Sequence, residues 1–233
     1  MNNDRLWRSV AEPVRARFPQ PARAGSSTVS ETRLRRTAGR ATVDAMPLDR
    51  FLLASNGFEH HLRAVPPDGW HAPTPCTEWD IRALVNHMTR GNLNYVGLLR
   101  GATREEFLAA RDDDALGDDP VAAFTASVRA CAAAFAETGA LDRVVDYPLG
   151  KLTGRRALAV RTADSTVHTW DLARALGADD ALDPGLVAWI DESYDDIFAG
   201  LALNPRVFAD APPTAPGASR QDRLLTRFGR DPR

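Results

Sequence analysis

The segment Asp164-Ser-Thr-Val-His168-Thr-Trp-Asp171 lies in the middle of a long stretch that we predict to be a single helix. The helix runs from near Thr153 to just before Gly177, because glycine suits the left-handed turn that often closes a helix. At about 100° per residue, the side chains of the two aspartates and the histidine fall within roughly 60° of one another. One face of this helix therefore carries two carboxylates and an imidazole.

Other segments repeat apolar residues at the spacing of a helix. Their predicted bounds are about 47–65, 81–99, 120–138 and 184–200. Thr77-Glu-Trp-Asp80, just before the second of them, resembles a capping box with Asp in place of the usual Glu or Gln. Between the helices, residues 103–119 hold at most a short helix, and residues 139–152 form a loop or a small strand pair.

Four long helices with apolar stripes imply a bundle. We therefore predict an all-α fold, a four-helix bundle with a small additional C-terminal helical and irregular segment. The chain has 233 residues, of which 44% are hydrophobic and 26% charged, and this composition suits one globular domain with tails.

The first 45 residues differ from the rest in charge. They hold nine arginines and four acidic residues, a net charge of +5, whereas the whole chain has a net charge of −2. We expect residues 1–45 to be a disordered, Arg-rich extension and residues 46–233 to be the folded domain. Met46, where helical periodicity begins, is the expected true start. An Arg-rich arm could also bind nucleic acid, but nothing else in the sequence favours that role.

Several classes of protein are disfavoured by the sequence. No run of apolar residues approaches the length of a transmembrane helix. The two cysteines, Cys76 and Cys131, form no CxxC pair, which argues against a cysteine-based zinc site, and we expect a reducing, cytoplasmic location. No phosphate-binding loop, dinucleotide-binding glycine pattern or GxSxG nucleophile motif is present.

A divalent-metal site is the chemistry that the remaining polar residues favour. His87 lies beside the apolar stripe of the predicted helix 81–99. If this helix faces the one that carries Asp164 and His168, the three side chains come together. Two imidazoles and one carboxylate form a typical three-ligand set for zinc, with nickel or another divalent ion as the alternative, and leave a position open for water or substrate. Asp171 would then accept a hydrogen bond from an imidazole N–H or contact substrate.

Simpler interpretations of the same residues remain open. Asp164 and Asp171 stand at i−4 and i+3 from His168, which also suits ion pairs on a helix surface. A single histidine such as His87 is more often an ordinary polar residue than a ligand. We expect His60, His61 and His71 to be solvated or structural, and Cys76 to be a packed turn residue.

Three segments resemble a known family. Residues Trp70–His87, residues Val167–Ala175 and the tail Ala211–Pro232 are similar, in this order, to mycothiol-dependent maleylpyruvate isomerase-like proteins of the DinB/YfiT-like superfamily. The tail resembles the end of a short actinobacterial subgroup that is described only as metal-binding. The resemblance covers roughly residues 46–233.

The resemblance implies a four-helix bundle whose divalent metal ion is held by a histidine of the second helix and a carboxylate-x3-histidine of the fourth. These positions correspond to His87, Asp164 and His168, the residues already selected. It also implies a thiol-dependent transferase or isomerase that uses mycothiol as cosubstrate. The chain departs from the isomerase in two ways, because it has Asp164 where the isomerase has Glu and it ends without a sterol-carrier-like domain. Isomerisation of maleylpyruvate itself is therefore not predicted.

We thus expect a metal- and thiol-dependent transferase or isomerase. Its partners would be a low-molecular-weight thiol and a small electrophile, with no membrane and no nucleic acid, and the chain could form a homodimer. The alternative is a non-catalytic metal-binding or ligand-sensing bundle, or an interaction module with a degenerate site.

Overall fold

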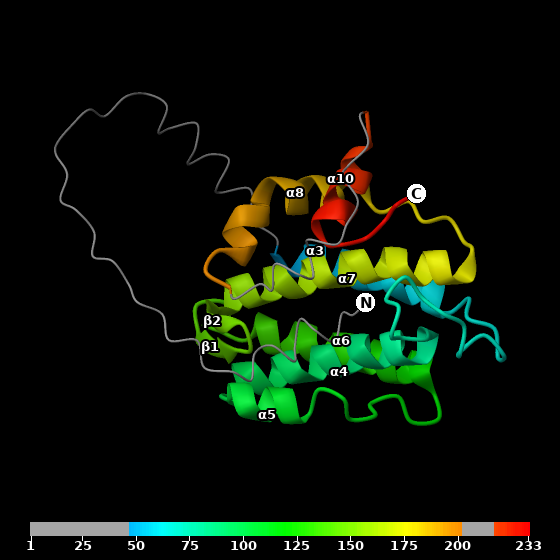
Figure 1. The fold of residues 1–233 in the computed structure, drawn as a ribbon. Coiled ribbons are helices and arrows are strands. Elements are labelled where there is room, and N and C mark those ends of the chain that lie inside the picture. The colour runs from blue at the N-terminus through cyan, green and yellow to red at the C-terminus, as the bar shows by residue number, and fades with distance from the viewer. Residues whose placement is uncertain (1–46, 202–216) are drawn as a thin grey trace, which may run out of the picture.

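The computed structural model describes residues 47–201 and 217–233 (Figure 1). Its core is formed by four helices, α3 (Pro47–Leu62), α4 (Ile81–Leu99), α6 (Pro120–Ala136) and α7 (Gly154–Leu176). Helix α3 packs against α6 and α7, and α4 packs against the same two helices, so the four form a closed ring. The structure confirms the predicted all-α four-helix bundle.

Two further helices cover the outer side of α7. Helix α8 (Pro184–Phe198) packs on α7, and α10 (Arg220–Arg227) packs on α8. Figure 1 shows both on the side of α7 that faces away from α4 and α6. Because α3, α4 and α8 surround α7, this helix is buried along most of its length.

The segments between the bundle helices contain only short regular elements. Helix α5 (Arg104–Ala109) is a brief helix after α4, and strands β1 (Val144–Tyr147) and β2 (Gly150–Thr153) form an antiparallel hairpin. The last residue of β2 also begins α7, because the Thr153 side chain accepts a hydrogen bond from the backbone N–H of Arg156. The hairpin therefore fixes where the central helix starts.

Helix α7 is unusual in carrying many polar residues in the interior. The hydroxyls of Thr162, Thr166 and Thr169 are buried, and each donates a hydrogen bond to the backbone carbonyl four residues earlier, at 2.8–2.9 Å. Such bonds remove the penalty for an unpaired buried donor. The helix can therefore hold polar functional groups inside the bundle.

One predicted cap and one predicted helix end were wrong. Helix α4 begins at Ile81 as predicted, but its N-cap is Asp80, whose side chain accepts from the N–H of Ala83, so there is no capping box on Thr77. The Thr74 hydroxyl donates to the carbonyls of Cys76 and Trp79 and keeps the residues before α4 in a turn. Helix α3 ends at Leu62 rather than near residue 65, since the residues before a proline disfavour helical backbone.

The expected disordered extension 1–45 and the start at Met46 lie outside the described residues. Within residues 47–201 and 217–233, no helix combines the length and apolar character needed to cross a membrane.

Gly154 should be intolerant of any side chain. A Cβ atom at this position would lie 2.0 Å from the carbonyl oxygen of Ala140. We expect Gly154→Ala to lower the free energy of unfolding by about 2–3 kcal/mol, because the backbone must move to relieve the overlap. Chemical denaturation measures the change.

Gly97→Ala is the matched control within α4. Its new Cβ would meet the Cβ of Ala102 at 3.5 Å, an ordinary contact, so the gain in helix propensity should raise stability by up to about 1 kcal/mol. If Gly154→Ala and Gly97→Ala lowered the free energy of unfolding equally, the contact with Ala140 would not explain the effect at Gly154.

Candidate metal centre

The polar face of α7 brings three predicted residues together. His168 Nε2 lies 3.3 Å from Asp164 Oδ1, and His168 Nδ1 lies 2.8 Å from Asp171 Oδ2. These contacts join residues four and three positions apart, as the helical spacing predicts. The imidazole of His168 is thus held between two carboxylates.

Helix α4 supplies the third predicted ligand from the opposite side. His87 Nε2 lies 3.5 Å from Asp164 Oδ2, and the two imidazole rings have centroids 5.0 Å apart. One donor atom from each of His87, Asp164 and His168 lies within 4.8 Å of the other two. Trp79 covers the pair of rings, with its own ring 4.6 Å from that of His87.

This donor set fits a divalent metal ion. Around zinc, with bonds of about 2.0–2.1 Å, two ligand atoms of a tetrahedron lie about 3.3 Å apart, close to the two distances above. His87 Nε2 is buried and makes no hydrogen bond within the described part of the chain. An unpaired buried nitrogen is costly, and a metal ion would satisfy it. The Asp164 side chain is 35% exposed, so the cluster can be reached from outside.

The pKa values of the two histidines shift in opposite directions. Burial lowers the pKa of His87, and the nearby Asp164 offsets this only in part. Burial would also lower the pKa of His168, but Asp164 and Asp171 raise it well above the usual value. Burial would raise the pKa of Asp164, yet the histidines, above all His168, hold it well below its ordinary range. Asp164 therefore stays ionised between the two imidazoles.

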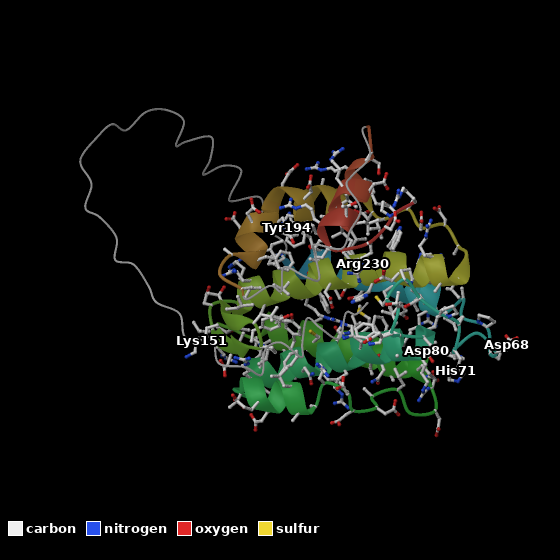
Figure 2. The ribbon with its side chains drawn as sticks, in the orientation of Figure 1. Asp68, His71, Asp80, Lys151, Tyr194 and Arg230 are labelled. Carbon is white, nitrogen blue, oxygen red and sulfur yellow. The ribbon has the colours of Figure 1, made fainter. Side chains whose placement is uncertain are left out.

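Asp171 orients His168 and is itself held by the C-terminal segment. Arg230 donates from Nε to Oδ1 at 3.2 Å and from Nη2 to Oδ2 at 2.7 Å, and Figure 2 places Arg230 between α7 and α10. The Cys76 thiol donates to the same carboxylate at 3.3 Å. Burial would raise the pKa of Asp171, but the charge of Arg230 holds it well below its usual value. The Asp171 side chain is fully buried, which suits an orienting role better than contact with substrate.

Arg161 is a second buried arginine beside the centre. It is 1% exposed, and its Nη1 donates to Asp164 Oδ2 at 2.6 Å. Its other nitrogens donate to the side chain of Asn92 and to the backbone carbonyl of Met88 on α4. Asp164 is therefore shared between the histidines and a guanidinium.

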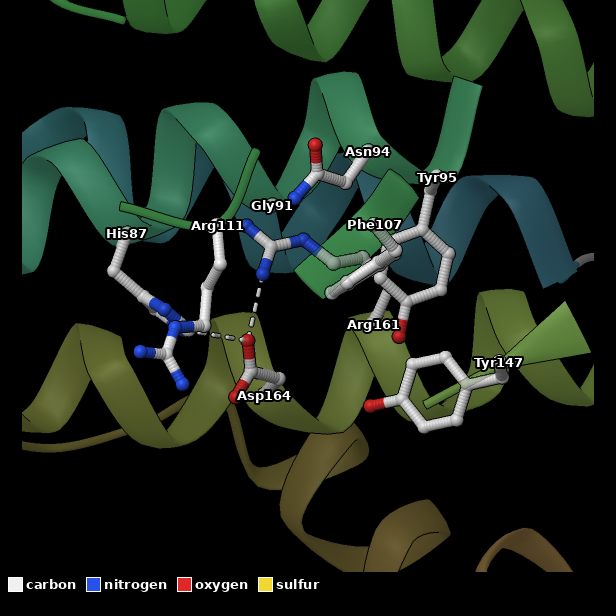
Figure 3. A pocket seen from close by; sticks show the side chains of 9 residues that line it. All are labelled: His87, Gly91, Asn94, Tyr95, Phe107, Arg111, Tyr147, Arg161 and Asp164. Carbon is white, nitrogen blue, oxygen red and sulfur yellow. Dashed lines mark hydrogen bonds and ion pairs between the residues drawn. The ribbon is translucent and has the colours of Figure 1, made fainter. Parts of the chain in front are cut away.

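A pocket opens next to these residues. Figure 3 shows it between α4, α7 and the hairpin. His87, Arg161 and Asp164 line it near the candidate metal centre, and the remaining wall is formed by Gly91, Asn94, Tyr95, Phe107, Arg111 and Tyr147. Burial raises the pKa of both tyrosines, so their hydroxyls stay protonated at neutral pH. The pocket thus combines an aromatic wall with one polar end.

Three histidines and Cys131 lie apart from the centre, whereas Cys76 contacts it through Asp171. His60 and His61 stand in the last turn of α3, and His71 is exposed and bonds to Asp80 at one end of the bundle (Figure 2). Cys131 lies in the core, where burial raises the pKa of its thiol to about 12. Cys76 is buried in its turn, as expected, but the contact with Asp171 was not foreseen.

Neither Arg161 nor Arg230 was singled out by the sequence. Arg161 had a usable signal, because it stands three residues before Asp164, a spacing at which a helix can form an ion pair. Arg230 is 59 residues from Asp171, and only the fold brings the two together.

Comparison with known proteins identifies the family of the chain. Residues 51–173 match the family described as the mycothiol maleylpyruvate isomerase N-terminal domain. The chain belongs to this family. The matching region contains the three candidate ligands and Asp171, but it ends before the segment that carries Arg230.

Two relatives are uncharacterized proteins of Mycobacterium tuberculosis, from the strains CDC 1551 / Oshkosh and ATCC 25618 / H37Rv. Each is 34% identical over 140 residues, which cover 60% of this chain and 72% of the relative. No solved structure gives a significant match.

The ion pair between Arg230 and Asp171 should contribute strongly to stability. Replacing Arg230 with Gln leaves a buried carboxylate without its counter-charge, so we expect the free energy of unfolding to fall by about 3 kcal/mol. Urea denaturation of the metal-free protein measures this loss.

Arg227→Gln is the matched control, because this neighbouring arginine pairs with Asp195 at the surface. It should change stability by less than about 1 kcal/mol. A double variant, Arg230→Gln with Asp171→Asn, should recover part of the loss, since it removes the unpaired charge. If Arg230→Gln and Arg227→Gln lowered the free energy of unfolding equally, the result would argue against a buried ion pair at Arg230.

Proposed function

We propose that the protein binds one divalent metal ion through His87, Asp164 and His168 and uses it to activate a low-molecular-weight thiol. Zinc is the expected ion, with nickel as the alternative, and mycothiol is the expected thiol. The reaction would be the transfer of the thiol to a small electrophile, or a thiol-assisted isomerisation.

One observation carries this proposal. His87 Nε2 is buried without a hydrogen-bond partner among the described residues, and it points at the carboxylate that His168 also contacts. Two helices thus direct three donor groups at one place, and the fold leaves one of them unsatisfied. Membership of the mycothiol maleylpyruvate isomerase N-terminal domain family supports the choice of thiol.

Each residue has a defined part in this chemistry. A divalent ion held there would supply Lewis acidity, which lowers the pKa of a thiol and makes a thiolate available at neutral pH. Asp171 accepts a hydrogen bond from Nδ1–H of His168, which leaves Nε2 as the nitrogen that would bind the ion once its own proton is displaced. Arg230 fixes Asp171 in turn.

The pocket supports an enzyme over a purely structural metal site. A structural site is closed by four protein ligands, whereas a catalytic site keeps one position open. The pocket in Figure 3 begins at His87 and Asp164, so one side of the centre is left open to a ligand. Tyr95 and Tyr147, whose hydroxyls interact with each other, form part of the pocket wall.

Metal content tests the first part of the proposal. Elemental mass spectrometry of the purified protein should find about one divalent ion per chain, and His87→Ala and His168→Ala should each abolish it. His71→Ala is the matched control, because His71 is exposed and lies outside the cluster. A wild-type protein that holds no metal after reconstitution with zinc or nickel would rule out the proposal.

Thiol chemistry tests the second part. The metal-loaded protein should accelerate the reaction of mycothiol with a generic electrophile well above the rate of the free thiol, and the metal-free protein should not. The measured quantity is the loss of free thiol with time. If the metal is bound but the rate is unchanged, the binding or ligand-sensing role is favoured instead.

A further inference from the structure

Arg161 places a buried positive charge directly beside a proposed metal ligand. Its side chain is almost fully buried, and Nη1 donates to Asp164 Oδ2 at 2.6 Å. A fixed cation at this distance opposes the binding of another cation. The position of Arg161 therefore cannot be explained by affinity for the metal ion.

Helix α4 holds the guanidinium in this position. Arg161 Nε donates to Asn92 Oδ1 at 2.8 Å, and Nη2 donates to the carbonyl oxygen of Met88 at 2.6 Å. Gly91 provides the necessary room, because a Cβ atom there would lie 2.8 Å from Nη1. With contacts on several sides, the charge cannot move away when a metal ion arrives.

The charges around the centre balance in pairs. Asp164 is matched by Arg161, and Asp171 is matched by Arg230. The two histidines bind a metal ion as neutral imidazoles. The two positive charges of a divalent ion would therefore have no counter-charge among these residues, and a ligand entering the pocket is placed to supply it.

Arg161 also lines the pocket into which such a ligand would enter. Figure 3 shows its guanidinium between α4 and Asp164, with the aromatic residues beyond it. A wall of low polarity strengthens electrostatic attraction across the pocket. We propose that Arg161 makes this pocket selective for anionic over neutral ligands, a class that includes thiolates and carboxylates. This inference rests on the proposed metal site and names the residue that sets its ligand preference.

Cobalt(II) has a visible spectrum that reports both its binding to the protein and the binding of a further ligand to the metal. The protein is loaded with cobalt, and azide, an anion, and imidazole, a neutral ligand, are titrated separately at neutral pH while the visible spectrum of the metal is recorded. We expect Arg161→Gln to lower the preference for azide over imidazole by about tenfold, because one nearby positive charge is lost. The same variant should bind cobalt at least as tightly as the wild type, because a repelling charge has gone.

Three further variants separate charge from structure. Arg161→Lys keeps the charge and should keep most of the preference for azide. Arg174→Gln removes a partly exposed positive charge from the same helix. It should change neither the affinity for azide nor the affinity for imidazole. If Arg161→Gln does not fold, Asn92→Asp places a carboxylate against Arg161 Nε and should reduce the preference in the same direction.

The outcomes distinguish this inference from the proposed function. Absence of cobalt binding in the wild type overturns both. Normal cobalt binding with an unchanged azide preference in Arg161→Gln overturns the role of Arg161 alone. An equal loss of preference in Arg161→Lys and Arg161→Gln would mean that Arg161 acts through packing and not through its charge.

Discussion

The burial of α7 is the constraint on which the rest of the structure depends. Because α3, α4 and α8 surround this helix, every charged group on its inner faces needs a partner within the protein. Asp164 obtains Arg161 and two histidines, and Asp171 obtains Arg230 and His168. The result is a row of alternating charges along one helix. Such a row explains why a helix with many polar residues can occupy the centre of the bundle.

The ion pair between Arg230 and Asp171 extends the functional unit beyond the family domain. The family match ends at residue 173, whereas Arg230 belongs to the segment after α10. Its guanidinium reaches back over α7 and contacts both Asp171 and Cys76, so it joins the outer helices to the candidate metal centre. The orientation of His168 therefore depends on a part of the chain that the family domain does not include.

The sequence could predict what depends on local spacing. Apolar periodicity, prolines and glycines located the bundle helices, and positions four and three apart placed Asp164, His168 and Asp171 on one face. The convergence of His87 with them required two apolar stripes to face each other, which periodicity suggests but does not fix. Arg161 and Arg230 escaped prediction for a different reason. In a chain whose basic residues are almost all arginine, composition cannot separate a buried guanidinium from a solvated one.

The aspartate at position 164 can be understood together with Arg161. The resemblance described above implies a glutamate at this position in the isomerase, whose side chain reaches further than aspartate. In this chain the shorter carboxylate presents Oδ1 to His168 and Oδ2 to both His87 and Arg161. If this carboxylate holds a metal ion as proposed, Arg161 would draw electron density from it and make it a weaker donor, which would leave the ion more electrophilic. Such an ion would favour a negatively charged ligand, in line with the selectivity proposed for Arg161.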